Sequence, residues 1–200
     1  MVGGRWRRPG VIAGRYQPIE TAKPGAPFRA RDAATAQTVV IHTIGGVTDA
    51  APWLSRAAMV IGLFHPSLVT LFDGVQSAPS TLLAVCEFVP AQPLRRVMAG
   101  APLNARRAAE LVSEVADAVA ELHARGFAHG AISADSVWVT AKGKAKLDLV
   151  PAIRETGASE EGDVRALVAL VGEAAGRDLL HGPSVESVAV LAAHLRLLRP

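Results

Sequence analysis

Short hydrophobic runs separated by turn residues fill the first ninety positions of the chain, a pattern typical of β-strands. Residues 14–32 predict two short strands on either side of a Pro/Gly turn at 23–27. Residues 36–44 are rich in β-branched side chains and predict a third strand. Two more strands are predicted at 67–75 and 81–89, with turn residues between them. We therefore expect a small sheet in this half of the chain.

One helix is predicted among these strands, at residues 49–64. Pro52 suits its first turn, where a backbone N–H has no partner within the helix. The spacing of the apolar residues places five of them near one face, namely Trp53, Ala57, Val60, Ile61 and Phe64.

Beyond Pro90 the hydrophobic pattern changes to the longer period of helices. Residues 91–127 predict two helices, the second with an N-cap at Asn104 and a stop at Gly126. The apolar stripe of this second helix is formed by Leu111, Val115, Ala118 and Leu122.

Two short strands are predicted next, at 136–140 and 144–150. A polar linker at 151–162 leads into a helix at 163–176, and a last helix is predicted at 184–198.

The order of these elements predicts an α+β fold with a small N-terminal β-sheet lobe, which holds one helix, and a helical C-terminal lobe. The lobes are expected at 14–90 and 91–200, after a flexible basic lead-in at 1–13, and together they form one domain. A chain of 200 residues is long enough to bury a substantial core in this way.

Composition narrows the classes of function. Half of the residues are hydrophobic but only 4% are aromatic, so the core must be built from Ala, Val, Leu and Ile. The net charge of +3 is mild and gathers in the segment 4–10. Because no basic stripe is interleaved with aromatic residues, we expect no nucleic-acid partner. Cys86 is the single cysteine, which excludes an internal disulfide and argues against a cysteine-based metal site.

No apolar run reaches the roughly 18 residues that a membrane span requires. The N-terminus also lacks the apolar core of a signal peptide. These two features predict a cytoplasmic protein, or the cytoplasmic domain of a membrane protein.

Six segments in this order resemble the protein kinase fold, from about Gly14 to Gly176. Cys86 falls at the gatekeeper position of the fifth strand and hinge. The segments are GRYQPIE, ARDAATAQTVVIHTI, LFHPSLVTLFD, LLAVCEFVPAQPL, LHARGFAHGAISADSVWV and GDVRALVALVGEAAG. The resemblance implies a two-lobed kinase-like fold with the nucleotide site of the family between the lobes.

Kinase phosphoryl transfer needs a glycine-rich phosphate cradle and a lysine paired with a glutamate. The cradle position reads TAKPGAPF, where only Gly25 remains, so a plain hairpin turn is favoured. The lysine position holds His42, and the glutamate position of the helix falls on Arg56. A neutral imidazole beside a cation does not replace that ion pair, so His42 is expected to be a structural strand residue.

The catalytic-loop motif His-Arg-Asp maps onto His129, Gly130 and Ala131. The base position is therefore a methyl group, which accepts no proton. The lysine of the loop maps to Ser133 and its magnesium-binding asparagine to Ser136.

The second metal motif of the family, Asp-Phe-Gly, aligns in two ways. Without a gap, its aspartate position falls on Leu149; with a deletion of one residue it falls on Asp148. Magnesium takes oxygen ligands from more than one source, and the asparagine is missing, so Asp148 is favoured as a strand-end acid. The linker after it has about a dozen residues, which leaves no room for the activation segment and peptide platform of the family, and the C-terminal lobe is truncated.

The resemblance and these losses together imply a catalytically inactive pseudokinase that acts as a protein-interaction or regulatory scaffold in phospho-signalling or at the cell envelope. The chain looks most similar to degenerate kinase domains of actinobacteria, which implies a phosphothreonine-reading forkhead-associated domain or an active Ser/Thr kinase as the protein partner. No cofactor is expected; the remaining candidates are hinge residues Glu87 and Val89 for nucleotide and Asp148 for metal. The alternative is an atypical Ser/Thr kinase-family protein with residual ATP binding or nucleotide sensing.

Overall fold

The computed structural model describes residues 10–21, 23, 25–180 and 185–198. The chain divides into two compact units. The first consists of residues up to Ile61 together with Leu71–Phe88, and the second consists of Gly62–Thr70 together with the residues from Val89 onward. The predicted lead-in at 1–13 lies mostly outside the described residues.

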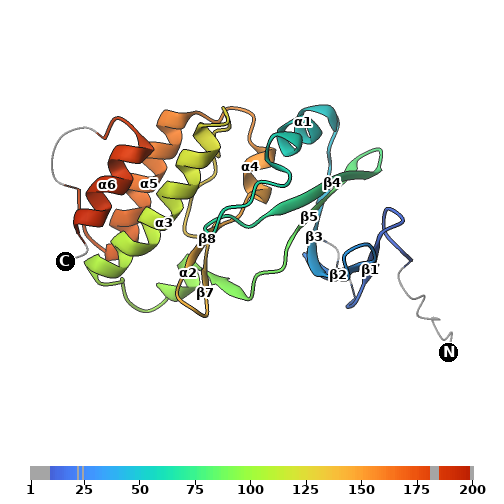
Figure 1. The fold of residues 1–200 in the computed structure, drawn as a ribbon, viewed down its shortest axis with the longest axis horizontal. Coiled ribbons are helices and arrows are strands. Elements are labelled where there is room, and N and C mark those ends of the chain that lie inside the picture. The colour runs from blue at the N-terminus through green and yellow to red at the C-terminus, as the bar shows by residue number, and fades with distance from the viewer. Residues whose placement is uncertain (1–9, 22, 24, 181–184, 199–200) are drawn as a thin grey trace. The chain divides into compact units, whose positions relative to one another are not determined.

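The first unit is a five-stranded antiparallel sheet with one helix (Figure 1). The strand order is β1-β2-β3-β5-β4, and the helix α1 packs against β4. The elements are β1 (Tyr16–Pro18), β2 (Phe28–Asp32), β3 (Thr38–Gly45), α1 (Ala51–Val60), β4 (Leu71–Ala78) and β5 (Thr81–Glu87). The predicted strands of this half are thus confirmed.

The side-chain pattern of these strands explains the core of the first unit. In β2 buried and exposed residues alternate strictly, as expected for a strand with one face against the core. The inner strand β5 is buried almost throughout, from Leu82 to Cys86, which fits its position between β3 and β4. One cluster of buried residues joins β1, β2, β3 and β5: Tyr16, Phe28, Ala30, Val39, Ile41, Leu83 and Val85.

The predicted helix at 49–64 is wrong at its C-terminal end. The helix ends at Val60, and Gly62 adopts a left-handed conformation with φ of +73°, which glycine accepts without steric cost. Of the predicted apolar face, Ala57 and Val60 are buried, whereas Phe64 lies beyond the helix with 74% of its surface exposed.

The described residues of the second unit form five helices and a three-stranded sheet (Figure 1). The long helices α3, α5 and α6 lie side by side and pack pairwise against one another. The helices are α2 (Leu94–Val97), α3 (Ala105–His123), α4 (Val150–Arg154), α5 (Glu160–Ala175) and α6 (Val188–Leu197). The sheet has the order β6-β7-β8, formed by β6 (Ala91–Pro93), β7 (Val137–Thr140) and β8 (Ala145–Leu147).

Helix α3 follows its sequence prediction. The side chain of Asn104 accepts a hydrogen bond from the backbone N–H of Arg107 at 2.8 Å, which caps the helix start. Its whole predicted stripe is buried, from Leu111 to Leu122. After the helix, Gly126 takes a positive φ of +70° and ends it.

Residues 62–70 were expected in the N-terminal lobe, but they belong to the second unit. The reason is their pairing with β8. The backbone N–H of Val69 donates to the carbonyl of Leu147 at 2.9 Å, and the Lys146 ammonium donates to the carbonyl of Leu68 at 2.9 Å. Leu68 itself is fully buried.

Two short elements differ from the sequence prediction. Residues 91–93 form β6 rather than the start of a helix, and Pro93 has the extended φ/ψ of −56° and 142° before the single turn α2 begins. Residues 150–154 form α4 with Pro151 in its first turn, whereas residue 150 was predicted to end a strand and residues 151–154 to belong to a linker. Burial of Val150, Ala152 and Ile153 stabilises this short helix.

Candidate functional site

A buried aspartate at the start of α5 holds the segment that resembles a kinase catalytic loop. The Oδ2 atom of Asp163 accepts a hydrogen bond from the backbone N–H of His129 at 2.7 Å, and its Oδ1 atom accepts one from Gly130 at 2.7 Å. The ring of His123, at the end of α3, lies with Nε2 2.8 Å from Oδ2 of the same carboxylate. Asp163 has no exposed surface, so these three donors replace the water that an ionised carboxylate needs.

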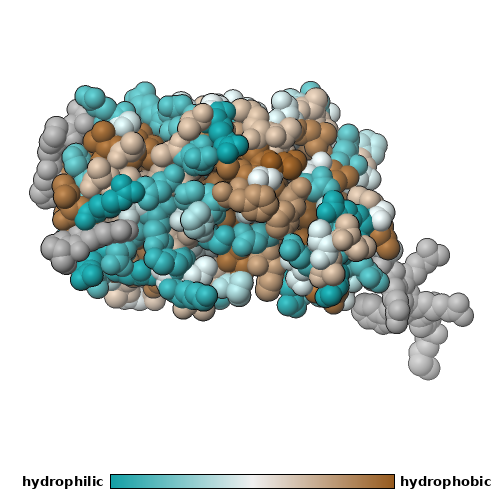
Figure 2. All heavy atoms as spheres, viewed as in Figure 1, coloured by the Kyte–Doolittle hydropathy of each residue, from teal (hydrophilic) through white to brown (hydrophobic). Residues whose placement is uncertain are grey.

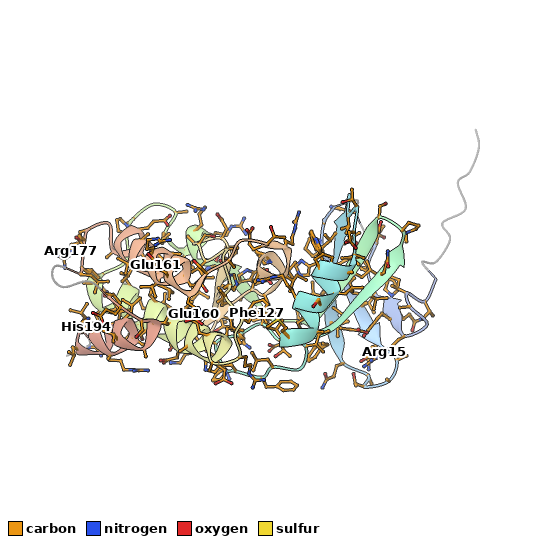
Figure 3. The ribbon with its side chains drawn as sticks, turned by 90° about the horizontal axis from the view of Figure 1, so that it is seen from above. Arg15, Phe127, Glu160, Glu161, Arg177 and His194 are labelled. Carbon is orange, nitrogen blue, oxygen red and sulfur yellow. The ribbon has the colours of Figure 1, made fainter. Side chains whose placement is uncertain are left out.

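The sequence prediction missed this role of Asp163. The signal was present, because Asp163 shares a helical face with the buried residues Leu167, Leu170 and Ala174. A lone acid on an otherwise apolar buried stripe indicates a specific partner, since aspartate is rarely buried unpaired. Figure 3 labels Glu160, the first residue of α5, and Phe127, which lies between α3 and the loop.

His129 is fully buried, and its hydrogen bonds fix its tautomer. The backbone N–H of Ala131 lies 3.2 Å from Nδ1, and the carbonyl oxygen of Asp148 lies 2.9 Å from Nε2. An amide N–H only donates and a carbonyl only accepts, so Nδ1 is the acceptor and Nε2 carries the proton. His129 is therefore a neutral imidazole that joins the loop to the residue after β8.

The loop positions after His129 at which the sequence comparison expects kinase catalytic residues carry other side chains. Ala131, at the base position, offers only a methyl group. The Ser136 hydroxyl is turned into the loop, where it donates to the carbonyl of Ser133 at 3.2 Å and accepts from the Ser133 N–H at 2.9 Å. Asp135 faces the other way and forms an exposed ion pair with Arg95 of α2 at 2.8 Å.

The linker between α4 and α5 lies directly on the loop at Gly130. Gly130 has a φ of +73°, and a Cβ atom built there would lie 2.6 Å from the Cβ of Ala158 and 3.3 Å from that of Glu155. Only glycine fits this close approach. The position at which the kinase motif has an arginine therefore has no space for a side chain.

Asp148 is buried, and one carboxylate oxygen accepts a hydrogen bond from the backbone N–H of Val150 at 2.9 Å, at the start of α4. Its own N–H donates to the carbonyl of Ser136 at 2.8 Å. Leu149, the other candidate for the metal position, is buried and apolar. Across residues 10–21, 23, 25–180 and 185–198, no three His, Cys, Asp or Glu side chains gather in a group that could hold a metal ion.

The candidate residues of the first unit lie on its sheet and helix. His42 is half-buried in β3 opposite Ala84 of β5, and Arg56 is half-buried on α1. Glu87 ends β5 and is half-buried; the other hinge candidate, Val89, is buried and belongs to the second unit.

The turn at the cradle position is the hairpin that joins β1 and β2. Arg29 and Glu20 close it: the guanidinium of Arg29 pairs with the Glu20 carboxylate at 2.9 Å, and the Arg29 N–H donates to the same carboxylate at 2.6 Å. Gly25 has a φ of +74° in the turn, while residues 22 and 24 lie outside the described part of the chain. The antiparallel pairing of β1 and β2 on either side of this turn is as expected.

A charged network fastens β1 to the rest of its sheet. The guanidinium of Arg15 forms two hydrogen bonds with the buried carboxylate of Asp32, at 2.8 and 2.7 Å, and these hold the pKa of Asp32 well below its usual range. The hydroxyl of Tyr16 donates to Asp73 at 2.9 Å. Burial, together with that hydrogen bond, raises the pKa of Tyr16, which stays neutral. These contacts link the start of β1 to β2 and β4 of the same sheet.

Comparison with known proteins identifies the family to which this chain belongs. The family model for protein tyrosine and serine/threonine kinases matches residues 14–158, most of the chain. The chain therefore belongs to the protein kinase family.

Two bacterial relatives are similar to parts of the chain. Serine/threonine-protein kinase pkn3 of Myxococcus xanthus is 27% identical over 121 residues, which are 58% of this chain and 22% of that protein. Serine/threonine-protein kinase Pkn1 of the same organism is 32% identical over 85 residues, 42% of this chain and 12% of that protein. The chain thus spans less than a quarter of either relative. The described residues include no helix that is both long and apolar enough to cross a membrane.

Proposed function

We propose that this member of the kinase family is a pseudokinase, which transfers no phosphate and acts in the cytoplasm as a protein-interaction or regulatory domain. The observation that carries the proposal is Ala131 at the base position, beside a loop whose geometry is otherwise kept by Asp163 and His129. A side chain without a proton acceptor cannot serve as a general base.

The surroundings of Ala131 support the same proposal. Ser136 is 4% exposed, and its hydroxyl is engaged within the loop. The Asp148 carboxylate accepts from the N–H of Val150. Gly130 is covered by the linker at Ala158.

We expect no transfer of label when the protein is incubated with radiolabelled ATP and magnesium or manganese, either to itself or to a generic protein substrate. Calorimetric titration should give at most millimolar ATP affinity, about −4 kcal/mol, and no effect of magnesium, because the metal ligands and the lysine are missing.

Asp148→Ala is the control for this prediction, since Asp148 is the remaining candidate metal ligand. Label that persists in Asp148→Ala points to a contaminating kinase. Label that this substitution abolishes, or micromolar ATP affinity that EDTA weakens, contradicts the proposal and supports the alternative of residual ATP binding and nucleotide sensing.

The partner that we propose is a phosphothreonine-reading forkhead-associated domain, with an active Ser/Thr kinase supplying the phosphate. Thr156 lies exposed in the linker between α4 and α5, three residues before Ser159. Ser159 is occupied as the N-cap of α5, where its hydroxyl accepts from the N–H of Gly162 at 3.1 Å. Thr156 is therefore the more accessible hydroxyl of this linker.

Incubation with a threonine-directed bacterial kinase is expected to phosphorylate Thr156, which adds about −1.5 to −2 charges to the linker and creates a site for a forkhead-associated domain. Mass-spectrometric site mapping and a pull-down with such a domain are the measurements. Thr156→Val should abolish capture, whereas Thr48→Val, at an exposed loop threonine of the first unit, should not. Equal capture of both variants would exclude Thr156 as the docking site.

A further inference from the structure

The linker that carries Thr156 is fixed at both of its ends. At its start, the backbone N–H of Glu155 donates to a carbonyl of α4 at 3.2 Å, and Ile153 of that helix is only 4% exposed. At its end, Ala158 is half-buried. The four residues 154–157 between these points are exposed. Figure 2 shows hydrophilic residues (teal) at the surface near the start of α5, which Figure 1 locates.

Two contacts hold the C-terminal end of the linker. The first is with the loop at Gly130, because a Cβ atom built on Gly130 would lie 2.6 Å from the Cβ of Ala158. The second is with α5, where the Ser159 hydroxyl accepts a hydrogen bond from the N–H of Gly162 at 3.1 Å. The Ser159 carbonyl also accepts from the N–H of Asp163 at 3.0 Å, so the linker ends on the residue that caps the helix.

The linker in this position presents a hydroxyl but not a peptide. A protein that recognises a peptide segment contacts it on both sides of the central residue, so the segment has to be extended and accessible. The four exposed residues span at most about 14 Å when fully extended. On the C-terminal side, Gly157 alone separates Thr156 from Ala158. Recognition that reaches beyond Gly157 therefore has to remove Ala158 from the loop.

We propose that the linker 155–159 is a latch, which is closed when Ala158 lies on Gly130 and has to open before Thr156 is phosphorylated or bound. This inference rests on the function proposed above for Thr156. The two states exclude each other, because an extended segment through Ala158 and Ser159 neither covers Gly130 nor caps α5. Recognition of Thr156 is therefore reduced by the fraction of molecules in which the linker is closed.

Ser159→Ala tests the latch, because it removes the N-cap that holds the linker closed. Loss of such a cap should raise the population of the open linker about fivefold, which corresponds to about 1 kcal/mol. Ser187→Ala is the matched control. Ser187 caps α6 in the same way and accepts from the N–H of Val190 at 3.3 Å, so this variant loses a cap of the same kind away from the linker.

Cleavage after Glu155 by a glutamate-specific protease measures the opening without any phosphorylation. Proteolysis of a folded chain follows the population of the open form when opening and closing are fast relative to cleavage. The initial rate at this bond should rise about fivefold in Ser159→Ala and stay at the wild-type value in Ser187→Ala. Equal rates in the wild type and Ser159→Ala overturn the latch.

Phosphorylation by a threonine-directed bacterial kinase tests the consequence for Thr156. A free peptide of residues 150–163 should be modified at Thr156 at least several-fold faster than the intact chain. Ser159→Ala should raise the rate in the chain and leave the rate in the peptide unchanged, because the peptide has no latch to open. A chain that is modified as fast as the peptide overturns the latch. If neither is modified, Thr156 is not the target proposed above, and the protease experiment still decides whether the latch exists.

Discussion

Replacing Asp163 with alanine is expected to lower the free energy of unfolding by about 3–5 kcal/mol, the cost of breaking a buried ionic or hydrogen-bonded network by removing one partner. The substitution leaves the buried N–H groups of His129 and Gly130 without acceptors and removes the partner of His123. Urea or guanidinium denaturation followed by circular dichroism measures the loss.

Glu161→Ala is the matched control, because it removes an acid from the same first turn of α5. Glu161 is exposed and forms only a surface ion pair with Arg165, which is worth at most about 1 kcal/mol. The two variants should also differ in hydrogen exchange. The backbone amides of residues 129 and 130 should exchange faster in Asp163→Ala than in the wild type, whereas their exchange rates should not change in Glu161→Ala. Equal losses of stability in the two variants would show that Asp163 does not hold the loop.

Asp163 illustrates which part of the site can be predicted from a single sequence and which part cannot. The loop 129–136 is recognisable because its order of hydrophobic, turn and polar residues is local. Asp163 lies 33 and 34 residues from the two amides that it binds, so its role depends on how α5 packs beside α3. Periodicity places Asp163 on a buried face, but it names no partner.

The fold was predictable to a similar degree. Strands with strong alternation or β-branched runs, and the capped helix α3, follow from local pattern. Two features of the fold do not follow from local sequence pattern. Residues 62–70 join the second unit through backbone pairing with β8, which leaves no pattern in the side chains. Helix α4 is one turn long and is stabilised by burial of Val150 and Ile153, whereas its own sequence, with Pro151 inside it, has little helical preference.

Gly130→Ala is expected to be the other strongly destabilising substitution. A non-glycine residue at a φ of +73° costs about 1–2 kcal/mol. The added Cβ would also approach the Cβ of Ala158 to 2.6 Å, and such overpacking costs about 1–3 kcal/mol more. The total, roughly 2–5 kcal/mol, is measured by denaturant unfolding.

Gly126→Ala separates the two costs. Gly126 has nearly the same φ, +70°, but a Cβ there meets no atom within 4 Å, so this variant should lose only the conformational part. Ala158→Gly should recover part of the loss of Gly130→Ala, because it removes the carbon at 2.6 Å, while the Cα of residue 158 at 3.2 Å and the Cβ of Glu155 at 3.3 Å remain. If Gly130→Ala and Gly126→Ala lose equal stability, the linker does not press on the loop in solution. The same contact bears on the proposed function: an arginine at position 130 requires the linker to move away, so Gly130→Arg with Ala131→Asp should not by itself produce a working kinase loop.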